Sequence, residues 1–192
     1  MTELLSLWMP ILVATVVCFI LSTVLWTAVP LHDGDFDEAT DHEGLNKALA
    51  DLGLKPGHQY LFPFSRDKKH MSTPEFKERY EAGPWGLVRL FPRKANIGKN
   101  IGLTFVYFLI VTIVIAYVLA ETIVFGADFL RVFQIATTVA VLAYAAGPLL
   151  GYVWFPIPRR AVITGLVDGA VYALTTGVAF AALWPTLTAA AP

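Results

Sequence analysis

A run of histidine and acidic residues follows the first apolar stretch of the chain. It begins with His32, Asp33, Asp35 and Asp37, and His42 follows closely. Clustered carboxylate oxygens bind hard cations, and imidazole with carboxylate is a ligand set for zinc or iron. One hypothesis is therefore a metal ion held by His32, Asp33, Asp35 and Asp37, as in a metal-dependent membrane enzyme. The alternative is that these acids solvate a loop and cap the next helix.

Asp168 is a second candidate, because it is the only charged residue in four long apolar stretches: residues 4–31, 101–120, 132–158 and 161–192. It lies about two turns inside the last stretch, with Thr164 one turn before it and Tyr172 one turn after it. An ionisable side chain at such depth usually faces a bundle interior, a partner or water. Asp168 thus indicates a proton or cation site in a small transporter or proton-linked carrier. A purely structural hydrogen bond, with Tyr172 as donor, is the alternative.

Motifs of self-contained enzymes are absent from the sequence, which has no P-loop, G-x-G-x-x-G, C-x-x-C or H-E-x-x-H pattern. Two G-x-x-x-G pairs occur instead, formed by Gly147 with Gly151 and by Gly165 with Gly169. Small residues one turn apart let membrane helices approach closely. We therefore favour a non-enzymatic membrane protein that acts by association, either as a homo-oligomer or as an accessory subunit of a larger membrane complex.

The elements that position these residues are predicted to be membrane helices, because each apolar stretch exceeds the about 20 residues needed to cross a bilayer. We expect an all-α membrane protein with transmembrane helix 1 in residues 1–30. Helices 2 to 4 occupy residues 100–192, at about 100–123, 131–154 and 160–183. The first stretch is too long for the core of a cleaved signal peptide, so we expect a retained helix.

Residues 31–99 are expected to form a small α or α+β cytoplasmic module. Apolar spacing predicts a short helix after Asp41, and a capping box with proline predicts another over Pro74–Ala82. Two short apolar runs, residues 60–64 and 85–91, are expected to pair as strands.

Basic residues set the orientation, because 13 of the 14 lysines and arginines fall in the first and third connections. These connections should therefore face the cytoplasm, with both termini outside. Trp26 and Trp154 would lie at the inner interface. The bilayer is the expected partner, and a net charge of −1 gives no reason to expect nucleic acid. Six basic residues near helix ends should contact anionic lipids of the inner leaflet: Arg89, Arg93, Lys94, Lys99, Arg159 and Arg160.

The stretch Trp26-Thr-Ala-Val-Pro30-Leu-His32, followed by acids and by Gly57-His-Gln-Tyr60-Leu-Phe-Pro63, resembles a pattern in small bacterial four-helix membrane proteins of unassigned function. In these proteins an aromatic-x-x-x-Pro-x-His stretch ends the first helix. The resemblance covers roughly residues 20–63 and the four-helix layout. It implies a bacterial inner membrane, and hence periplasmic termini, and it transfers no catalytic residue.

Overall fold

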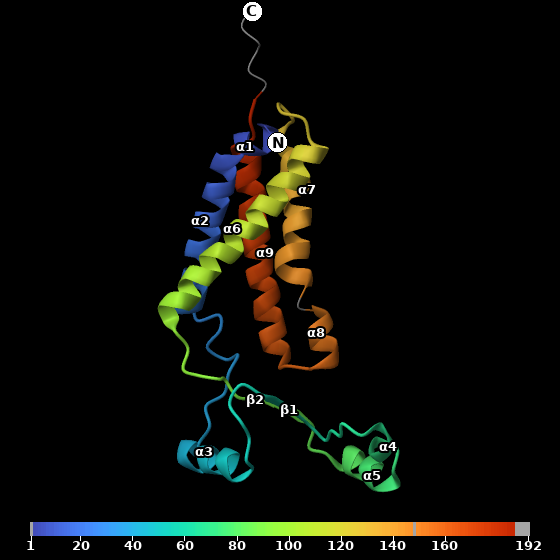
Figure 1. Cartoon of the computed structure of the whole chain (residues 1–192). Coiled ribbons are helices and arrows are strands. Elements are labelled where there is room, and N and C mark those ends of the chain that lie inside the picture. The colour runs from blue at the N-terminus through green and yellow to red at the C-terminus, as the bar shows by residue number, and fades with distance from the viewer. Residues whose placement is uncertain (1, 148, 187–192) are drawn as a thin grey trace, which may run out of the picture. The chain divides into compact units, whose positions relative to one another are not determined.

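The computed structural model describes residues 2–147 and 149–186, which divide into two compact units (Figure 1). The membrane unit combines residues up to 37 with residues from 97 onward. The connecting unit comprises residues 38–96. Residues 31–37, which we had assigned to the connection from the sequence, therefore belong structurally with the membrane helices.

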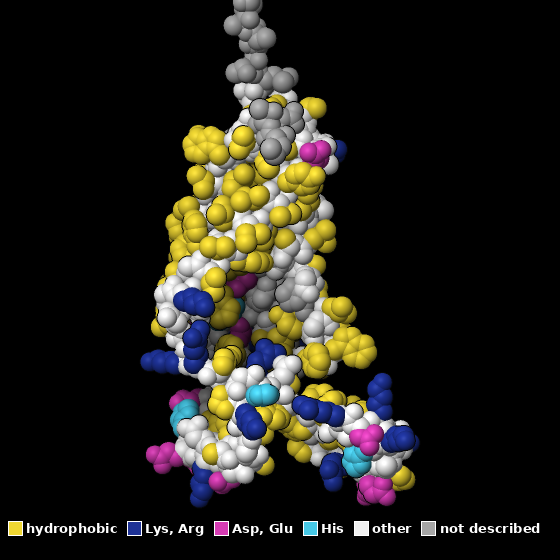
Figure 2. All heavy atoms as spheres, viewed as in Figure 1, with side chains coloured by type: hydrophobic (Ala, Val, Ile, Leu, Met, Phe, Trp, Pro, Cys, Tyr) yellow, Lys and Arg dark blue, Asp and Glu magenta, His cyan; other side chains and the backbone are white. Residues whose placement is uncertain are grey.

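Four helical segments of the membrane unit are long and apolar enough to cross a membrane: Trp8–Thr27, Ile97–Thr122, Phe129–Trp154 and Arg159–Ala182. They are α2, α6, the series from α7 to α8, and α9, and a short α1 (Thr2–Ser6) precedes α2. Hydrophobic side chains cover the visible face of these helices (Figure 2). The predicted set of four membrane-length helices is confirmed, and the first begins at Trp8, separated from α1 by Leu7.

The third apolar segment spans Phe129–Trp154, close to the predicted residues 131–154, but its helical geometry changes along its length. Helix α7 (Phe129–Val141) passes into a π-helical turn, η1 (Leu142–Ala146), and a separate α8 spans Leu149–Trp154. The sequence places Pro148 after this turn, and a proline lacks the N–H that an α-helix would bond to the carbonyl four residues earlier.

Helix α9 is the central element of the membrane unit, since it packs against α2, α7 and η1. Helix α6 crosses the bundle and packs against α2 and α7 (Figure 1). Small buried side chains allow this close approach, including Ala136 and Ala140 on α7 and Ala173 on α9.

The four glycines of the G-x-x-x-G pairs have different surroundings. A methyl group built at Gly169 would lie 2.7 Å from Cβ of Ala145, so this glycine permits the contact between α9 and η1. At Gly165 the nearest neighbour would be 3.9 Å away. At Gly147 and Gly151 it would meet none of the described atoms within 4 Å. Of these four glycines, only Gly169 therefore makes a tight packing contact with described atoms.

The connecting unit begins with α3 (His42–Asp51), whose first turn is capped by Asp41 through a 2.8 Å hydrogen bond from the Gly44 amide. Two further helices follow, α4 (Lys68–Met71) and α5 (Pro74–Ala82). The bounds of α5 are those that we predicted, and Thr73 caps it by accepting a hydrogen bond from the Phe76 amide.

Strands β1 (Gln59–Phe62) and β2 (Gly86–Arg89) form an antiparallel pair, which confirms the predicted pairing of the two apolar runs. Leu61 lies opposite Leu87, and Gln59 lies opposite Arg89. The helices α4 and α5 fall between the two strands in the sequence.

Candidate functional site

Asp168 accepts a hydrogen bond from the last turn of a different helix. Nε1 of Trp26, on α2, donates to Oδ2 of Asp168, on α9, over 2.9 Å. Trp26 is 55% exposed as a whole residue, whereas the Asp168 side chain is only 10% exposed. The indole therefore presents an apolar ring to the surroundings and its N–H to the buried carboxylate, as amphipathic rings do at membrane boundaries.

His32 lies between two carboxylates that come from different parts of the sequence. Its Nδ1 is 2.6 Å from Oδ2 of Asp35, and its Nε2 is 3.2 Å from Oδ2 of Asp168. The imidazole also stacks on the Trp26 ring, with centroids 4.0 Å apart. The His32 and Asp35 side chains are 9% and 5% exposed, so this contact is largely shielded from water.

Local geometry explains why His32 and Asp35 meet. Pro30 follows the last turn of α2, where its missing N–H cannot continue the helix. The chain then turns, and the Asp35 amide donates to the His32 carbonyl over 3.0 Å. This turn brings the two side chains together, and the packing of α2 on α9 brings Asp168 to the other edge of the imidazole.

Asp35 is held by groups from the start of α9. The Thr164 hydroxyl donates to its Oδ2 over 2.7 Å, and Nε of Arg160 lies 3.7 Å from its Oδ1. Burial raises the pKa of Asp35. The hydrogen bonds from His32 and Thr164, together with the positive charges of His32 and Arg160, lower this pKa by more than burial raises it. The net shift is downward, so Asp35 remains a carboxylate.

The hydrogen atoms of this cluster can be counted from its geometry. Because Asp35 is a carboxylate, Nδ1 of His32 must carry the hydrogen of their 2.6 Å contact. In a neutral imidazole the other nitrogen, Nε2, then has only a lone pair to present to Asp168. A favourable 3.2 Å contact therefore requires one further proton, on Nε2 or on the Asp168 carboxyl group. We call this the shared proton.

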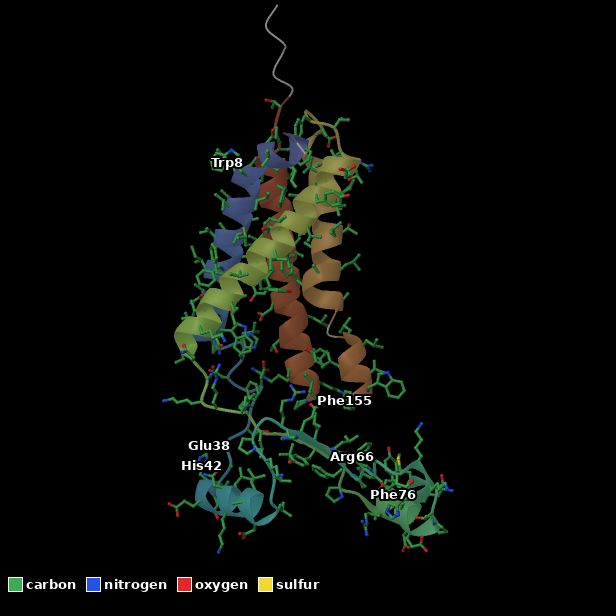
Figure 3. All side chains as sticks on the ribbon, viewed as in Figure 1. Trp8, Glu38, His42, Arg66, Phe76 and Phe155 are labelled. Carbon is green, nitrogen blue, oxygen red and sulfur yellow. The ribbon has the colours of Figure 1, made fainter. Side chains whose placement is uncertain are left out.

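The two sequence candidates, the acidic run and Asp168, thus meet in one site, which we call the His32 cluster: Trp26, His32, Asp35, Arg160, Thr164 and Asp168. Asp33 and Asp37 are exposed to solvent. His42 lies 3.3 Å from Glu38 as an exposed pair in the connecting unit (Figure 3).

The four residues predicted to hold a metal ion, His32, Asp33, Asp35 and Asp37, are not brought together by this arrangement. Among the described residues, no three His, Cys, Asp or Glu side chains are placed to hold a metal ion. The physical reason is their placement, since Asp33 and Asp37 are exposed to solvent whereas His32 and Asp35 are largely buried against each other. We therefore do not carry the metal-dependent enzyme further.

Polar groups continue from Asp168 into the bundle interior. The Tyr172 hydroxyl, one turn further along α9, interacts with the side chains of Asp168 and Ser22. One more turn on, Thr176 lies 3.4 Å from Sγ of Cys18 on α2, with both side chains fully buried. The predicted partnership of Tyr172 with Asp168 is thus part of a longer polar interior between α2 and α9.

Trp26 and Arg160 were missed as members of the site. From the sequence, Trp26 was assigned only to the interface and Arg160 only to lipid contact. The sequence contained a signal for both. A carboxylate inside a membrane helix needs a hydrogen-bond or charge partner, and Trp26 and Arg160 are both predicted at the inner membrane interface, the side nearer Asp168.

No family model, curated protein or solved structure matches this chain.

Proposed function

We propose that this protein is a proton-linked membrane carrier, and that the proton shared by His32 and Asp168 is the coupling ion. One observation supports the proposal most strongly: a buried imidazole lies between two carboxylates, with each ring nitrogen within 3.2 Å of a carboxylate oxygen. Such a cluster would have two charge states. With the shared proton, His32 joins Asp35 and Asp168. Without it, a lone pair faces a carboxylate.

Loss of the shared proton would weaken the contact between the segment at residues 28–37 and α9. The repulsion between the Nε2 lone pair and the Asp168 carboxylate acts in a shielded site, where electrostatic interactions are stronger than in water. Trp26 would then be the main remaining donor to Asp168. Release of residues 28–37 from α9 would open the polar interior, at Tyr172 and Thr176, to solvent at the end of the bundle that carries the His32 cluster. Rebinding of a proton would close it again.

The cluster belongs to the cytoplasmic side of a bacterial inner membrane in this proposal. Arg159 and Arg160 begin α9 next to the cluster, and lysine and arginine favour the cytoplasmic ends of membrane helices. The carrier would thus take up or release its proton on the cytoplasmic side, with both chain termini in the periplasm.

Proton counting on the purified protein tests the site. We expect Asp168→Asn to release fewer protons than the unaltered protein when the pH is raised from about 6, where ordinary aspartates are already ionised, to about 9, measured with a pH-sensitive dye. Asp128→Asn is the matched control, because Asp128 only caps α7 by accepting from the Arg131 amide over 3.0 Å. An asparagine can accept the same hydrogen bond. Equal proton release by the two variants would contradict the proposal.

Transport is tested in sealed vesicles that contain the full chain and a pH dye in the lumen. We expect an imposed pH gradient to collapse faster than in protein-free vesicles. Asp168→Asn should abolish the difference, and Asp128→Asn should leave it unchanged. If the pH gradient collapses at the protein-free rate in vesicles with the unaltered protein, the protein is not a proton carrier, even if it binds the proton.

Association is the second candidate function, and the open surroundings of Gly147 and Gly151 favour it. Such a surface permits close approach of another membrane helix. The test is the mass of the complex in mild detergent. We expect Gly151→Leu to reduce it if this surface joins two subunits, and a monomeric unaltered protein without a co-purifying partner would exclude the idea.

A further inference from the structure

The paired strands of the connecting unit carry apolar side chains on a surface that the described residues leave open to solvent. Leu61 and Leu87 lie opposite each other across the antiparallel pair, so both project from the same face. They are 42% and 38% exposed. Trp85, directly before β2, is 61% exposed, and Phe91, just after it, is 77% exposed. Large apolar surfaces of this kind normally mark an interaction site.

Basic side chains accompany these apolar ones. Arg89 pairs with Gln59 on the same face as Leu61 and Leu87, and Nη2 of Arg89 donates to the Gln59 side chain over 3.2 Å. Arg93 and Lys94 follow and are exposed. No acidic residue occurs between positions 82 and 120. We call this surface the hairpin face: Leu61, Trp85, Leu87, Arg89, Phe91, Arg93 and Lys94.

We propose that the hairpin face binds the surface of an anionic lipid bilayer. Interfacial membrane-binding segments combine Trp, Phe and Leu with Arg and Lys. Their apolar groups enter the headgroup region, and their basic groups contact lipid phosphates. The sequence alone predicted lipid contact for Arg89, Arg93 and Lys94, and the strand register adds Leu61 and Leu87 on the face that carries Arg89.

A short stretch of chain connects the hairpin face to a membrane-length helix. Helix α6, one of the four membrane-length helices, begins at Ile97, eight residues after Arg89. Eight residues span at most about 29 Å when fully extended. The hairpin face is therefore tethered within reach of the bilayer that α6 would enter, which favours lipid over a soluble protein partner. The inference does not depend on proton binding by the His32 cluster.

The experiment measures lipid contact in the full chain, with one copy in each lipid nanodisc. A fluorophore is attached at Leu87→Cys in a Cys18→Ala background, and nitroxide-labelled lipids serve as the quencher. We expect strong quenching in discs with phosphatidylglycerol and weaker quenching in phosphatidylcholine alone. Lys47→Cys on α3, an exposed position outside the hairpin face, is the control and should not be quenched.

A charge-matched pair of variants tests the basic part of the face. Replacing Arg89, Arg93 and Lys94 together by glutamine should abolish the extra quenching at position 87 in anionic discs. Replacing Arg66, Lys68 and Lys69 by glutamine changes the net charge equally and should leave the quenching in place.

Two outcomes would overturn the proposal. One is that aqueous iodide quenches the fluorophore equally at positions 87 and 47, while nitroxide lipids quench it at neither position. The other is protection of position 87 from iodide without lipid quenching, which would mean that protein covers the hairpin face. Neither outcome would alter proton release by Asp168, so failure here is distinguishable from failure of the carrier proposal.

Discussion

The indole N–H of Trp26 and the carboxylate of Asp168 form a 2.9 Å hydrogen bond between residues that are 142 positions apart in the chain. This bond joins the end of α2 to α9 beside His32. It gives the buried Asp168 carboxylate a donor that does not titrate.

Replacing Trp26 by phenylalanine should destabilise the membrane unit by about 1.5–3 kcal/mol, the range for hydrogen bonds to charged groups. The phenyl ring retains an aromatic surface for His32, so the donor is the main loss. Unfolding of the protein in bicelles measures the effect. Trp154→Phe is the control, since Trp154 is 74% exposed and should be neutral. Equal stability of the two variants would show that the bond to Asp168 contributes little.

Gly169→Ala should destabilise the bundle, because the added methyl group would lie 2.7 Å from Cβ of Ala145 and 3.0 Å from the Tyr144 carbonyl oxygen. Overpacking of this kind typically costs about 1–3 kcal/mol. Gly151→Ala is the matched control, with none of the described atoms within 4 Å of its methyl group. The same unfolding assay distinguishes them, and a neutral Gly169→Ala would refute the close contact of α9 with η1.

The stabilisation provided by Asp35 should depend on pH in a defined direction. Burial raises its pKa, while the hydrogen bonds from His32 and Thr164, and the charges of His32 and Arg160, lower it by more. The folded-state pKa therefore lies below the ordinary aspartate value of about 3.9. The resulting stabilisation is fully present above that value and is lost as the pH falls through the lowered pKa.

Apparent unfolding temperatures measured against pH check this sign. Asp35→Asn should be less stable than the unaltered protein at neutral pH, and the difference should shrink in acid. Asp33→Asn, at an exposed neighbouring position, should follow the unaltered protein throughout. A constant difference between Asp35→Asn and the unaltered protein at every pH would rule out a role for the ionised carboxylate.

A second interhelical contact tests the packing of α2 against α6. The hydroxyl oxygens of Thr15 and Thr112 lie 2.8 Å apart, and both side chains are fully buried. Each hydroxyl also bonds a carbonyl of its own helix, at Ile11 and Phe108, which limits the net value of the pair. A double-mutant cycle with valine should give a coupling of about 0.6 kcal/mol, typical of such bonds in membranes. Zero coupling would mean that the two helices are not in this register.

Much of the architecture could be predicted from the sequence, because hydropathy over about 20 residues and local capping chemistry are sufficient for it. The four membrane-length helices, the helix Pro74–Ala82 and the strand pair were all predicted from such local patterns. The π-helical turn Leu142–Ala146 was not predicted, since we gave no weight to Pro148 within an otherwise apolar stretch.

The site required information that a single sequence does not contain. His32 and Asp168 were both singled out, but as separate candidates, because 136 positions separate them. Their contact depends on which helices are neighbours, and the short connections constrained only the last three helices. The packing of α2 on α9 supplied the missing contact, and it changed the reading of His32 from metal ligand to partner of two carboxylates.

The most direct test of the shared proton is the nitrogen NMR spectrum of His32 in bilayer-embedded, ¹⁵N-histidine-labelled protein, with His32→Gln to assign its signals among the four histidines. We predict that Nδ1 is protonated and that the Nε2 signal reports a hydrogen bond to Asp168, which disappears in Asp168→Asn. An Nε2 signal that is the same in the unaltered protein and in Asp168→Asn at every pH would contradict the account.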